Sequence, residues 1–418
     1  MPPGGGGGGE GEHGCTAQDH PPATVRVDED ALPHSTPPLP AIAPVDPQEK
    51  RQRHPEASLP EGPLVEILAR VPYSSLCRFR CVSKPWLALC SSRDIIKRSP
   101  QTLSGFFYYG SNALLSFRNL SGRGLPQVDS SLPFLRERYK CIFVKEFCSG
   151  LLLCKCWELC SMRGESHYVV CNPATEEWTV LPPVEFTAQD LSHAFHIKPV
   201  PMLYLGFDAA VPSRFVVFAP LTVGCHVSGK MAIFSSETGQ WTYVQSKWSS
   251  GTAIDHACKR RVFLNGTLHL TTLDKSIVTV DMEGKVWREI KMPDGLPTAS
   301  DIVSIGQSQG RLYVWQVDNT HDCQLYIWVL EDYGTGKWAL KHTVNVLELF
   351  GRHRPEDADY YMMFAIHPDC NVVFLTNMKK ETTVSYDLDK QKVHVICTEF
   401  MCGLPYIPCF AELPSAGH

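Results

Sequence analysis

The spacing of apolar residues divides the chain into a helical stretch and a longer β-like stretch. Between residues 59 and 98 apolar positions recur every three or four residues, which predicts short amphipathic helices. A first helix is expected to begin near Glu61, with one apolar face formed by Leu64, Ile67, Leu68 and Val71. Pro72 ends this helix, because proline lacks the amide that would extend the hydrogen-bond ladder and disfavours a helical residue before it.

Two further short helices are predicted in the same stretch. Ser74 or Ser75 can cap the second helix and Ser83 the third, since a serine hydroxyl accepts a hydrogen bond from an amide of the first turn. Pro85 is compatible with the first turn of the third helix. The apolar positions are Leu76, Phe79 and Val82 on the second helix, Trp86, Leu87 and Leu89 on the third, and Ile95 and Ile96 in a closing turn.

The apolar residues of this stretch outnumber those that three short helices can bury among themselves. A unit of roughly 40 residues hardly buries enough surface to offset the entropy of its own chain. The surplus therefore indicates a helical partner surface, supplied either by another protein or by the rest of this chain.

The same stretch resembles the F-box, the adaptor-binding module of substrate receptors in cullin-RING ubiquitin ligases. The matching residues are Leu59-Pro60, Glu66-Ile67-Leu68, Arg70-Val71-Pro72, Ser75-Leu76, Arg78-Phe79-Arg80-Cys81-Val82, Lys84 and Trp86. The resemblance implies that a Skp-family adaptor, and through it a cullin, binds a face made of Leu59, Pro60, Leu64, Ile67, Leu68, Leu76 and Val82. Family members usually have an apolar residue in place of Pro63, so Gly62-Pro63 is expected to delay the first helix and to remove one adaptor contact.

Beyond residue 104 the pattern changes to short apolar runs separated by Gly, Pro, Asn and Asp, which is typical of an all-β domain. The runs repeat as two strands joined by a tight Gly or Asn turn, a third strand with a polar turn, and a fourth strand that contains Trp. A unit of about 50 residues with four strands is what a kelch-like propeller blade requires. The recurring tryptophans are Trp178, Trp241, Trp287 and Trp338, and Val393 holds this place in the last unit.

Five full units cover residues 141–400, and three strand-like segments are left over, at 106–110, 113–117 and 405–413. Together these segments can form a sixth blade that closes the ring. Closure is favoured because an open sheet of this size leaves exposed edges that promote aggregation. The predicted fold class is therefore mainly β: a small N-terminal three-helix F-box followed by a kelch-like β-propeller of six blades, with five or seven as alternatives.

The repeat region has a resemblance of its own. Segments 149–154 (SGLLLC) and 167–183 (HYVVCNPATEEWTVLPP) look like the F-box-associated repeat of the large plant family of F-box proteins, and segment 206–220 resembles that family's next segment. The resemblance implies a plant origin and a propeller that recruits a target protein. Asn172-Pro173 itself predicts a turn, because an Asn side chain can bond the backbone two residues on. The tryptophans are expected to pack between neighbouring blades.

Composition completes the domain plan. Residues 1–55 are rich in Gly and Pro with few large apolar residues, and we expect them to be disordered. Residues 56–100 are assigned to the F-box helical domain and residues 101–414 to the propeller. The net charge of −5 argues against broad binding to nucleic acid or to anionic membranes, which requires a positive field.

The expected location is the cytosol, the nucleus or both. The first residues lack the charged and apolar regions of a secretory signal, and no apolar run approaches the roughly 20 residues that span a bilayer. The 17 cysteines are then most simply thiols in a reducing compartment.

One cluster contains residue types that bind metals: Cys154, Cys156, Cys160, His167 and Cys171. A structural zinc site needs four converging ligands, usually in paired C-x₂₋₄-C spacing. Cys154 and Cys156 instead share one face of a predicted strand, and Cys160 lies past a turn, so we interpret these cysteines as buried or half-buried strand thiols. His193, His196 and the basic cluster Lys259-Arg260-Arg261 are expected in exposed loops.

Catalytic signatures are missing from the sequence. There is no H-E-x-x-H, no G-x-S-x-G and no dinucleotide-type glycine fingerprint after a strand. We therefore predict no catalytic, cofactor-binding or metal-binding residue, and no cofactor.

These patterns favour a non-enzymatic substrate receptor of an SCF-type cullin-RING E3 ubiquitin ligase. The F-box would dock on a Skp-family adaptor and the propeller would bind an unidentified target protein, raising its effective concentration at a reaction that other subunits perform. Two alternatives remain open: an adaptor-bound scaffold outside a ligase, and a propeller enzyme or ligand sensor with a polar site in its central channel. The sequence does not identify the target or the loops that bind it.

Overall fold

The structure, a computed structural model, describes residues 60–413 apart from 111–113, 124–125, 127, 159–165, 186–201, 209–213, 224, 250, 256–260, 298–302, 321–322, 353, 355–359 and 411. The chain divides into two compact units, Met1–Ser58 and Leu59–His418. Every described residue lies in the second unit, so the segment predicted to be disordered, residues 1–55, lies outside the described residues.

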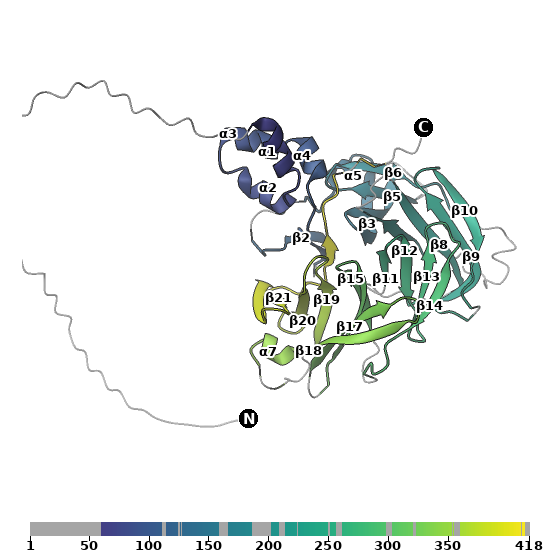
Figure 1. Ribbon diagram of the computed structural model, residues 1–418. Coiled ribbons are helices and arrows are strands. Elements are labelled where there is room, and N and C mark those ends of the chain that lie inside the picture. Colours follow the sequence, from purple (N-terminus) through teal and green to yellow (C-terminus); the bar gives the residue numbers. More distant parts are fainter. Residues whose placement is uncertain are drawn as a thin grey trace, which may run out of the picture. The chain divides into compact units, whose positions relative to one another are not determined.

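Four short helices open the described chain (Figure 1): α1 (Glu61–Leu68), α2 (Tyr73–Phe79), α3 (Lys84–Cys90) and α4 (Arg93–Arg98). The closing turn expected around Ile95 and Ile96 is thus a fourth helix. None of the helices in the described ranges is long and apolar enough to cross a membrane.

The helix starts correct two expectations. Pro63 does not delay α1, because the first intrahelical bond runs from the Leu64 amide to the Pro60 carbonyl and a proline before Leu64 loses no bond. Pro72, not a serine, is the N-cap of α2, and no side chain caps that helix. Ser83 does cap α3 as predicted, since its Oγ accepts a bond from the Trp86 amide at 3.4 Å.

Beyond the helices, five antiparallel sheets of four strands follow one another along the chain. We number these blades in chain order. Blade 1 contains β3 (Tyr139–Cys148), β4 (Leu151–Glu158), β5 (Ser166–Asn172) and β6 (Glu177–Val180), and blade 2 contains β7 (Tyr204–Phe207), β8 (Phe215–Val223), β9 (His226–Ser235) and β10 (Gln240–Gln245). Blade 3 contains β11 (Arg261–Leu264), β12 (Thr267–Thr271), β13 (Ser276–Asp281) and β14 (Trp287–Lys291). Blade 4 contains β15 (Ser304–Ser308), β16 (Arg311–Asp318), β17 (Gln324–Asp332) and β18 (Lys337–Asn345), and blade 5 contains β19 (Tyr361–Ile366), β20 (Val372–Asn377), β21 (Thr382–Asp387) and β22 (Lys392–Cys397). Two single-turn helices, α5 (Pro133–Arg136) and α7 (Val346–Leu349), lie in the connections.

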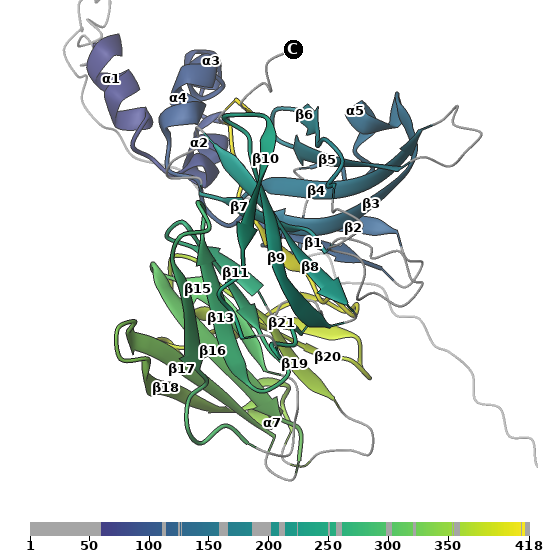
Figure 2. The same ribbon diagram turned by 90° about the vertical axis from the view of Figure 1, so that its right-hand side faces the viewer.

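A sixth, three-stranded sheet closes the ring. It contains β1 (Gly105–Tyr109), β2 (Leu115–Asn119) and β23 (Leu404–Tyr406) in the order β2-β1-β23, and we call it blade 6. The blue strand β1 and the last strand of the chain lie side by side (Figure 2), with Gly105 opposite Tyr406. The predicted six-bladed, mainly β fold is therefore confirmed, including the sixth blade built from segments far apart in the sequence.

The predicted tight turns join the first two strands of several blades. Ser149-Gly150, Asn265-Gly266 and Gln309-Gly310 each have positive φ at both residues, as hairpin turns of the primed types require. Asn172 forms the predicted turn after β5, because its Oδ1 accepts a bond from the Ala174 amide at 3.0 Å.

The hydrophobic core lies between neighbouring blades. Strand β1 shows the principle: successive side chains point to opposite faces, so Phe106 joins the cluster shared with blade 5 and Phe107 the cluster shared with blade 1. The strand-four tryptophans contribute to these junctions. Nε1 of Trp241 donates to the Pro182 carbonyl after blade 1 at 2.9 Å, and Nε1 of Trp338 donates to the Lys291 carbonyl of blade 3 at 2.8 Å.

The other two tryptophans have no such indole bond to a neighbouring blade among the described residues. Trp287 bonds the Gly284 carbonyl of its own blade and packs edge-on against Trp248, with ring centroids 5.0 Å apart. Trp178 lies 5.9 Å from Tyr139, the first residue of its own blade. Trp287 nevertheless packs against an apolar cluster that includes blades 2 and 3, and Trp178 against the cluster of blades 6 and 1, so packing between blades is confirmed for all four tryptophans.

Candidate functional site

The residues predicted to face an adaptor fall into two groups. Ile67 and Val82 lie on the surface, with 48% and 63% of their area exposed, and Pro60 is also exposed. Leu64 is half-buried, and Leu59 lies outside the described residues. The exposed members supply the apolar surface that the sequence predicted for this stretch.

Leu68 and Leu76 form the second group and are interior residues. They are 1% and 0% exposed and pack with Cys90 and Ile95 in the core of the four helices. In this arrangement they support the exposed residues from beneath and offer no surface to a partner. Amphipathic spacing places residues on the apolar side of a helix, but it does not say whether that side meets the chain's own core or another protein.

Leu87 on α3 is a surface residue that the prediction of the adaptor face did not include. Its side chain is 48% exposed, while Trp86 and Leu89 on the same helix pack against the helical core. The sequence could have predicted this exposure. Trp86 and Leu89 are three residues apart and share a helix face, and Leu87 falls outside that face. Val82, predicted on the second helix, lies in the turn between α2 and α3. The large apolar residues exposed in the described part of the F-box are therefore Ile67 on α1, Val82 in this turn and Leu87 on α3.

Arginines tie the helices to one another. The Arg80 guanidinium donates to the Cys90 carbonyl at 3.3 Å and lies 5.7 Å from the centre of the Tyr73 ring. Arg98 on α4 donates to both carboxylate oxygens of Glu66 on α1, at 2.7 and 2.8 Å. The Arg98 guanidinium lowers the pKa of Glu66.

The chain after β23 contacts both the helices and blade 1. We call residues 407–413 the C-terminal segment. Phe410 packs on Tyr73 of α2 with ring centroids 4.8 Å apart, and Glu412 accepts a bond from Lys97 of α4 at 2.6 Å. On the other side, Asn172 Nδ2 donates to the Cys409 carbonyl at 2.8 Å.

A second contact to blade 1 comes from the Leu413 amide, which donates to Glu177 at 2.8 Å. The sequence indicated only that this tail completes a blade. Its contacts join residues more than 200 positions apart, so no local pattern could have revealed them.

A cavity of about 160 Å³ lies where the first strands of several blades converge with β23. Its walls are mostly apolar and include Phe263, Ile305, Trp315 and Phe364. The Cys148 thiol at its edge is held by Phe207, whose amide donates to Sγ at 3.2 Å and whose carbonyl accepts from it at 3.3 Å. Burial raises the pKa of Cys148 to about 12, which suits a structural thiol and not a nucleophile.

Arg261 corrects the expectation of an exposed basic loop. The side chain is largely buried and forms an ion pair with Glu146 on β3, linking blades 3 and 1. Burial raises the pKa of Glu146 to about 7, although Arg261 opposes this shift. The tertiary fold decides this pairing, because the two residues lie more than 100 positions apart. Lys259, Arg260, His193 and His196 lie outside the described residues.

The described cysteines of the candidate metal cluster are buried strand thiols, as interpreted from the sequence. Cys154, Cys156 and Cys171 are 0% exposed and join the apolar cluster between blades 6 and 1. The Sγ atoms of Cys154 and Cys171 lie 4.0 Å apart, while His167 faces Glu158 at 3.6 Å. Cys160 lies outside the described residues, and no metal-ligand cluster is found among the residues that the structure describes.

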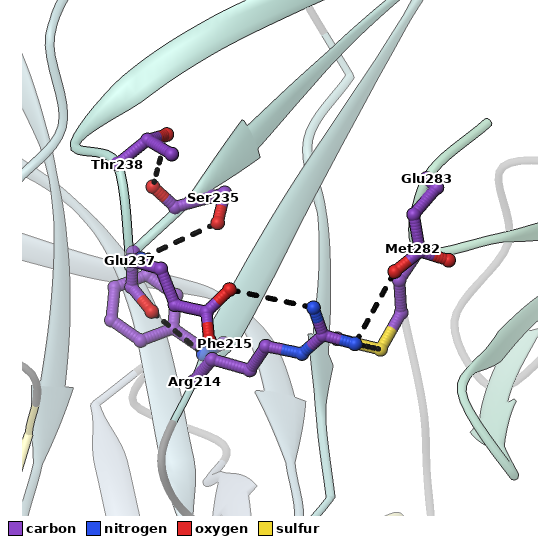
Figure 3. Close-up of polar contacts among 8 residues, drawn as sticks. Arg214, Phe215, Ser235, Glu237, Thr238, Met282 and Glu283 are labelled. Atoms are coloured by element: carbon purple, nitrogen blue, oxygen red, sulfur yellow. Dashed lines mark hydrogen bonds and ion pairs between the residues drawn. The ribbon is translucent and has the colours of Figure 1, made fainter.

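An exposed network links blades 2 and 3 through Arg214 (Figure 3). Its guanidinium lies 3.4 Å from Glu237 in the β9–β10 turn and 3.3 Å from Glu283 in the β13–β14 turn. Met282 Sδ is 3.6 Å from the same guanidinium. Solvent-exposed pairs of this kind contribute about 0–1 kcal/mol, so the network orients turns more than it stabilises the ring.

Comparison with known proteins agrees with both parts of the structure. The F-box domain family matches residues 57–98. The family described as "F-box protein At3g26010-like, beta-propeller" matches residues 104–402.

Curated relatives come from Arabidopsis thaliana. F-box protein At5g07610 is 28% identical over 308 residues, covering 68% of this chain and 69% of the relative. F-box protein At5g49610 is 27% identical over 303 residues, covering 69% and 80%, and F-box protein At3g26010 is 26% identical over 358 residues, covering 80% and 78%. With its propeller matched over most of the chain and an F-box before it, this protein belongs to the At3g26010-like β-propeller family of plant F-box proteins.

Proposed function

We propose that this protein is the substrate-recognition subunit of an SCF-type cullin-RING E3 ubiquitin ligase. The F-box, residues 56–100, docks on a Skp-family adaptor that joins it to a cullin, and the propeller, residues 101–414, holds a target protein. The chain itself performs no chemistry: it raises the concentration of the target beside a ubiquitin-loaded enzyme. We expect this activity in the cytosol, the nucleus or both.

The observation that carries the proposal is the set of exposed apolar residues in the F-box. Ile67, Val82 and Leu87 are about half exposed or more, although their neighbours are packed into a helical core. Fully burying such a side chain contributes about 1.5–3 kcal/mol, whereas association costs about 4–15 kcal/mol. Several of these contacts must therefore act together, and Leu68 and Leu76 hold them in place from inside the F-box.

The test is the double substitution Ile67→Asp with Val82→Asp in the full chain. We expect co-purification of the adaptor to be lost, because two carboxylates would have to be buried without partners. The propeller should keep its thermal unfolding transition. Leu68→Asp is unsuitable, since it would charge the interior of the F-box.

The matched control is Leu340→Asp, which charges an exposed apolar residue on β18 of the propeller. It should leave adaptor binding unchanged. Adaptor binding that survives the double substitution would overturn the proposed docking face. Adaptor without cullin in the purified complex would overturn the ligase assignment while leaving the docking face intact.

A further inference from the structure

An exposed aromatic pair lies where blade 6 meets blade 1. Tyr109 ends β1 and Phe143 lies on β3, and their rings stack with centroids 5.6 Å apart at 19°. Tyr109 is 37% exposed and Phe143 45%. Two exposed aromatics in contact offer a larger continuous apolar surface than a single one, and aromatic residues dominate the energetics of interfaces.

The Tyr109 ring of this pair is anchored through its hydroxyl group. The Tyr109 hydroxyl donates to the Val144 carbonyl and accepts from the Val144 amide, both at 3.1 Å. These bonds fix a side chain of blade 6 to the backbone of blade 1. A ring that is already ordered loses little conformational entropy when a partner covers it.

One lysine lies against the aromatic pair, and a second is exposed on the same strand. Lys145 Nζ lies 4.6 Å from the centre of the Phe143 ring, and Lys140 is exposed on the same strand. No ion pair to either lysine occurs within the part of the chain that the structure describes. In a protein with a net charge of −5, this local positive charge favours an anionic partner.

The patch lies away from the point where the F-box joins the propeller. The chain leaves α4 at Arg98 and enters β1 at Gly105, whereas Tyr109 is at the opposite end of that strand. Leu114, in the turn from β1 to β2, is also exposed. In a propeller the equivalent turns of all blades share one rim, and those of blades 3 and 5 carry exposed Leu273 and Met378.

We propose that Tyr109, Phe143 and Lys145 form a docking patch for the target protein, and that the patch takes a segment presenting an apolar side chain flanked by Asp or Glu. The apolar side chain packs on the stacked rings while the carboxylates pair with Lys145 and Lys140. This inference rests on the proposed function, because it assumes a receptor that binds a target protein. It adds where on the propeller the target binds and which side chains the target presents.

The test uses a phage-displayed library of random linear peptides, selected on the full chain alone, with adaptor co-purification measured separately on the same chain. We expect enrichment of peptides with an apolar residue between acidic ones. Phe143→Ala should weaken binding of a selected peptide about tenfold or more, as loss of an interface anchor does. Lys145→Glu should abolish the acidic preference, and added salt should weaken binding to the wild type.

Two controls separate the patch from the fold. Tyr243→Ala removes an aromatic of matched exposure, 46%, from the outer strand of blade 2 and should leave peptide binding unchanged. Tyr109→Phe keeps the ring but removes the bonds to Val144, and should weaken binding by less than Phe143→Ala. Thermal unfolding of each variant reports whether the propeller remains folded, and Lys145→Glu changes only an exposed side chain.

The inference is overturned if no peptide is enriched, if the enriched peptides are basic or lack charge, or if Phe143→Ala binds as well as the wild type. A chain that binds its adaptor but fails these tests keeps the proposed function and loses this patch. A chain that selects acidic peptides but binds no adaptor loses the proposed function while the patch stands.

Discussion

His269 shows how burial sets the protonation state of a single residue. It is 0% exposed on β12, its Nδ1 lies 3.0 Å from the Thr267 carbonyl, and its Nε2 meets the hydroxyl of Tyr333 from blade 4. A neutral imidazole can donate from one nitrogen and accept at the other, so both contacts are satisfied without charge. Burial lowers the pKa of His269 to about 4.

This pKa makes the stability of the ring depend on pH. The unfolded chain takes up the proton near pH 6.5 and the folded chain only near pH 4, so acidification between these values favours unfolding. Between about pH 7.5 and about pH 5, we expect the free energy of unfolding to fall by about 2 kcal/mol more in the wild type than in His269→Gln. Denaturant titrations at both pH values measure the difference, and parallel losses in the two proteins would contradict it.

At the scale of elements, the C-terminal segment connects the F-box helices to blade 1, two regions that the sequence predicts to be separate domains. Phe410 and Glu412 contact the F-box helices, while Cys409 and Leu413 are bonded to blade 1. The Lys97–Glu412 pair is partly exposed and contributes about 0–1 kcal/mol alone. The packing of Phe410 on Tyr73 adds an aromatic contact of about 0.5–1.5 kcal/mol beyond the area it buries.

Removal of residues 407–418 should therefore loosen the F-box helices without opening the ring. We expect faster amide hydrogen exchange in α2 and α4, because the contacts to Tyr73 and Lys97 are lost. Exchange in β17 of blade 4 serves as the internal reference, because the contacts described for this segment go to the F-box helices and to blade 1. Unchanged protection of α2 and α4 would show that the segment does not stabilise them.

At the scale of the whole molecule, the ring depends on one short strand. β23 has only three residues, Leu404–Tyr406, yet it pairs with β1 and brings the last part of the propeller against the first. Its Tyr406 packs with Phe107 and Phe117 at centroid distances of 5.2 and 5.7 Å. A closed ring leaves no free inner edge, whereas an open one exposes β1 to other chains.

Truncation after Cys397 removes β23 and should destabilise the whole propeller. We expect a fall in the unfolding midpoint of more than about 2–4 °C, the shift that 1 kcal/mol causes in a domain of roughly 150–250 residues, together with a tendency to aggregate. Truncation after Tyr406 keeps the strand and is the matched control. Equal unfolding midpoints for the two truncated proteins would mean that β23 does not hold the ring closed.

The sequence alone determined the repeated architecture. Alternating apolar runs, the tryptophans of the fourth strands and the Gly or Asn turns are local signals, because strand, turn and cap chemistry act between residues close in the chain. For the same reason the Asn172 turn, the Ser83 cap and the buried thiols of blade 1 were predicted correctly.

Only the tertiary structure decided which apolar residues remain on the surface and which charges meet. Ile67 and Leu68 are neighbours in sequence, yet one is half exposed and the other is sealed in the helical core. Arg261 belongs to a basic cluster of the kind usually found in exposed loops, but its side chain is largely buried and paired with Glu146. The exposure of a side chain and its pairing with distant residues depend on how separate elements pack together. That packing is set by the free energy of the whole chain, and a short stretch of sequence does not contain this information.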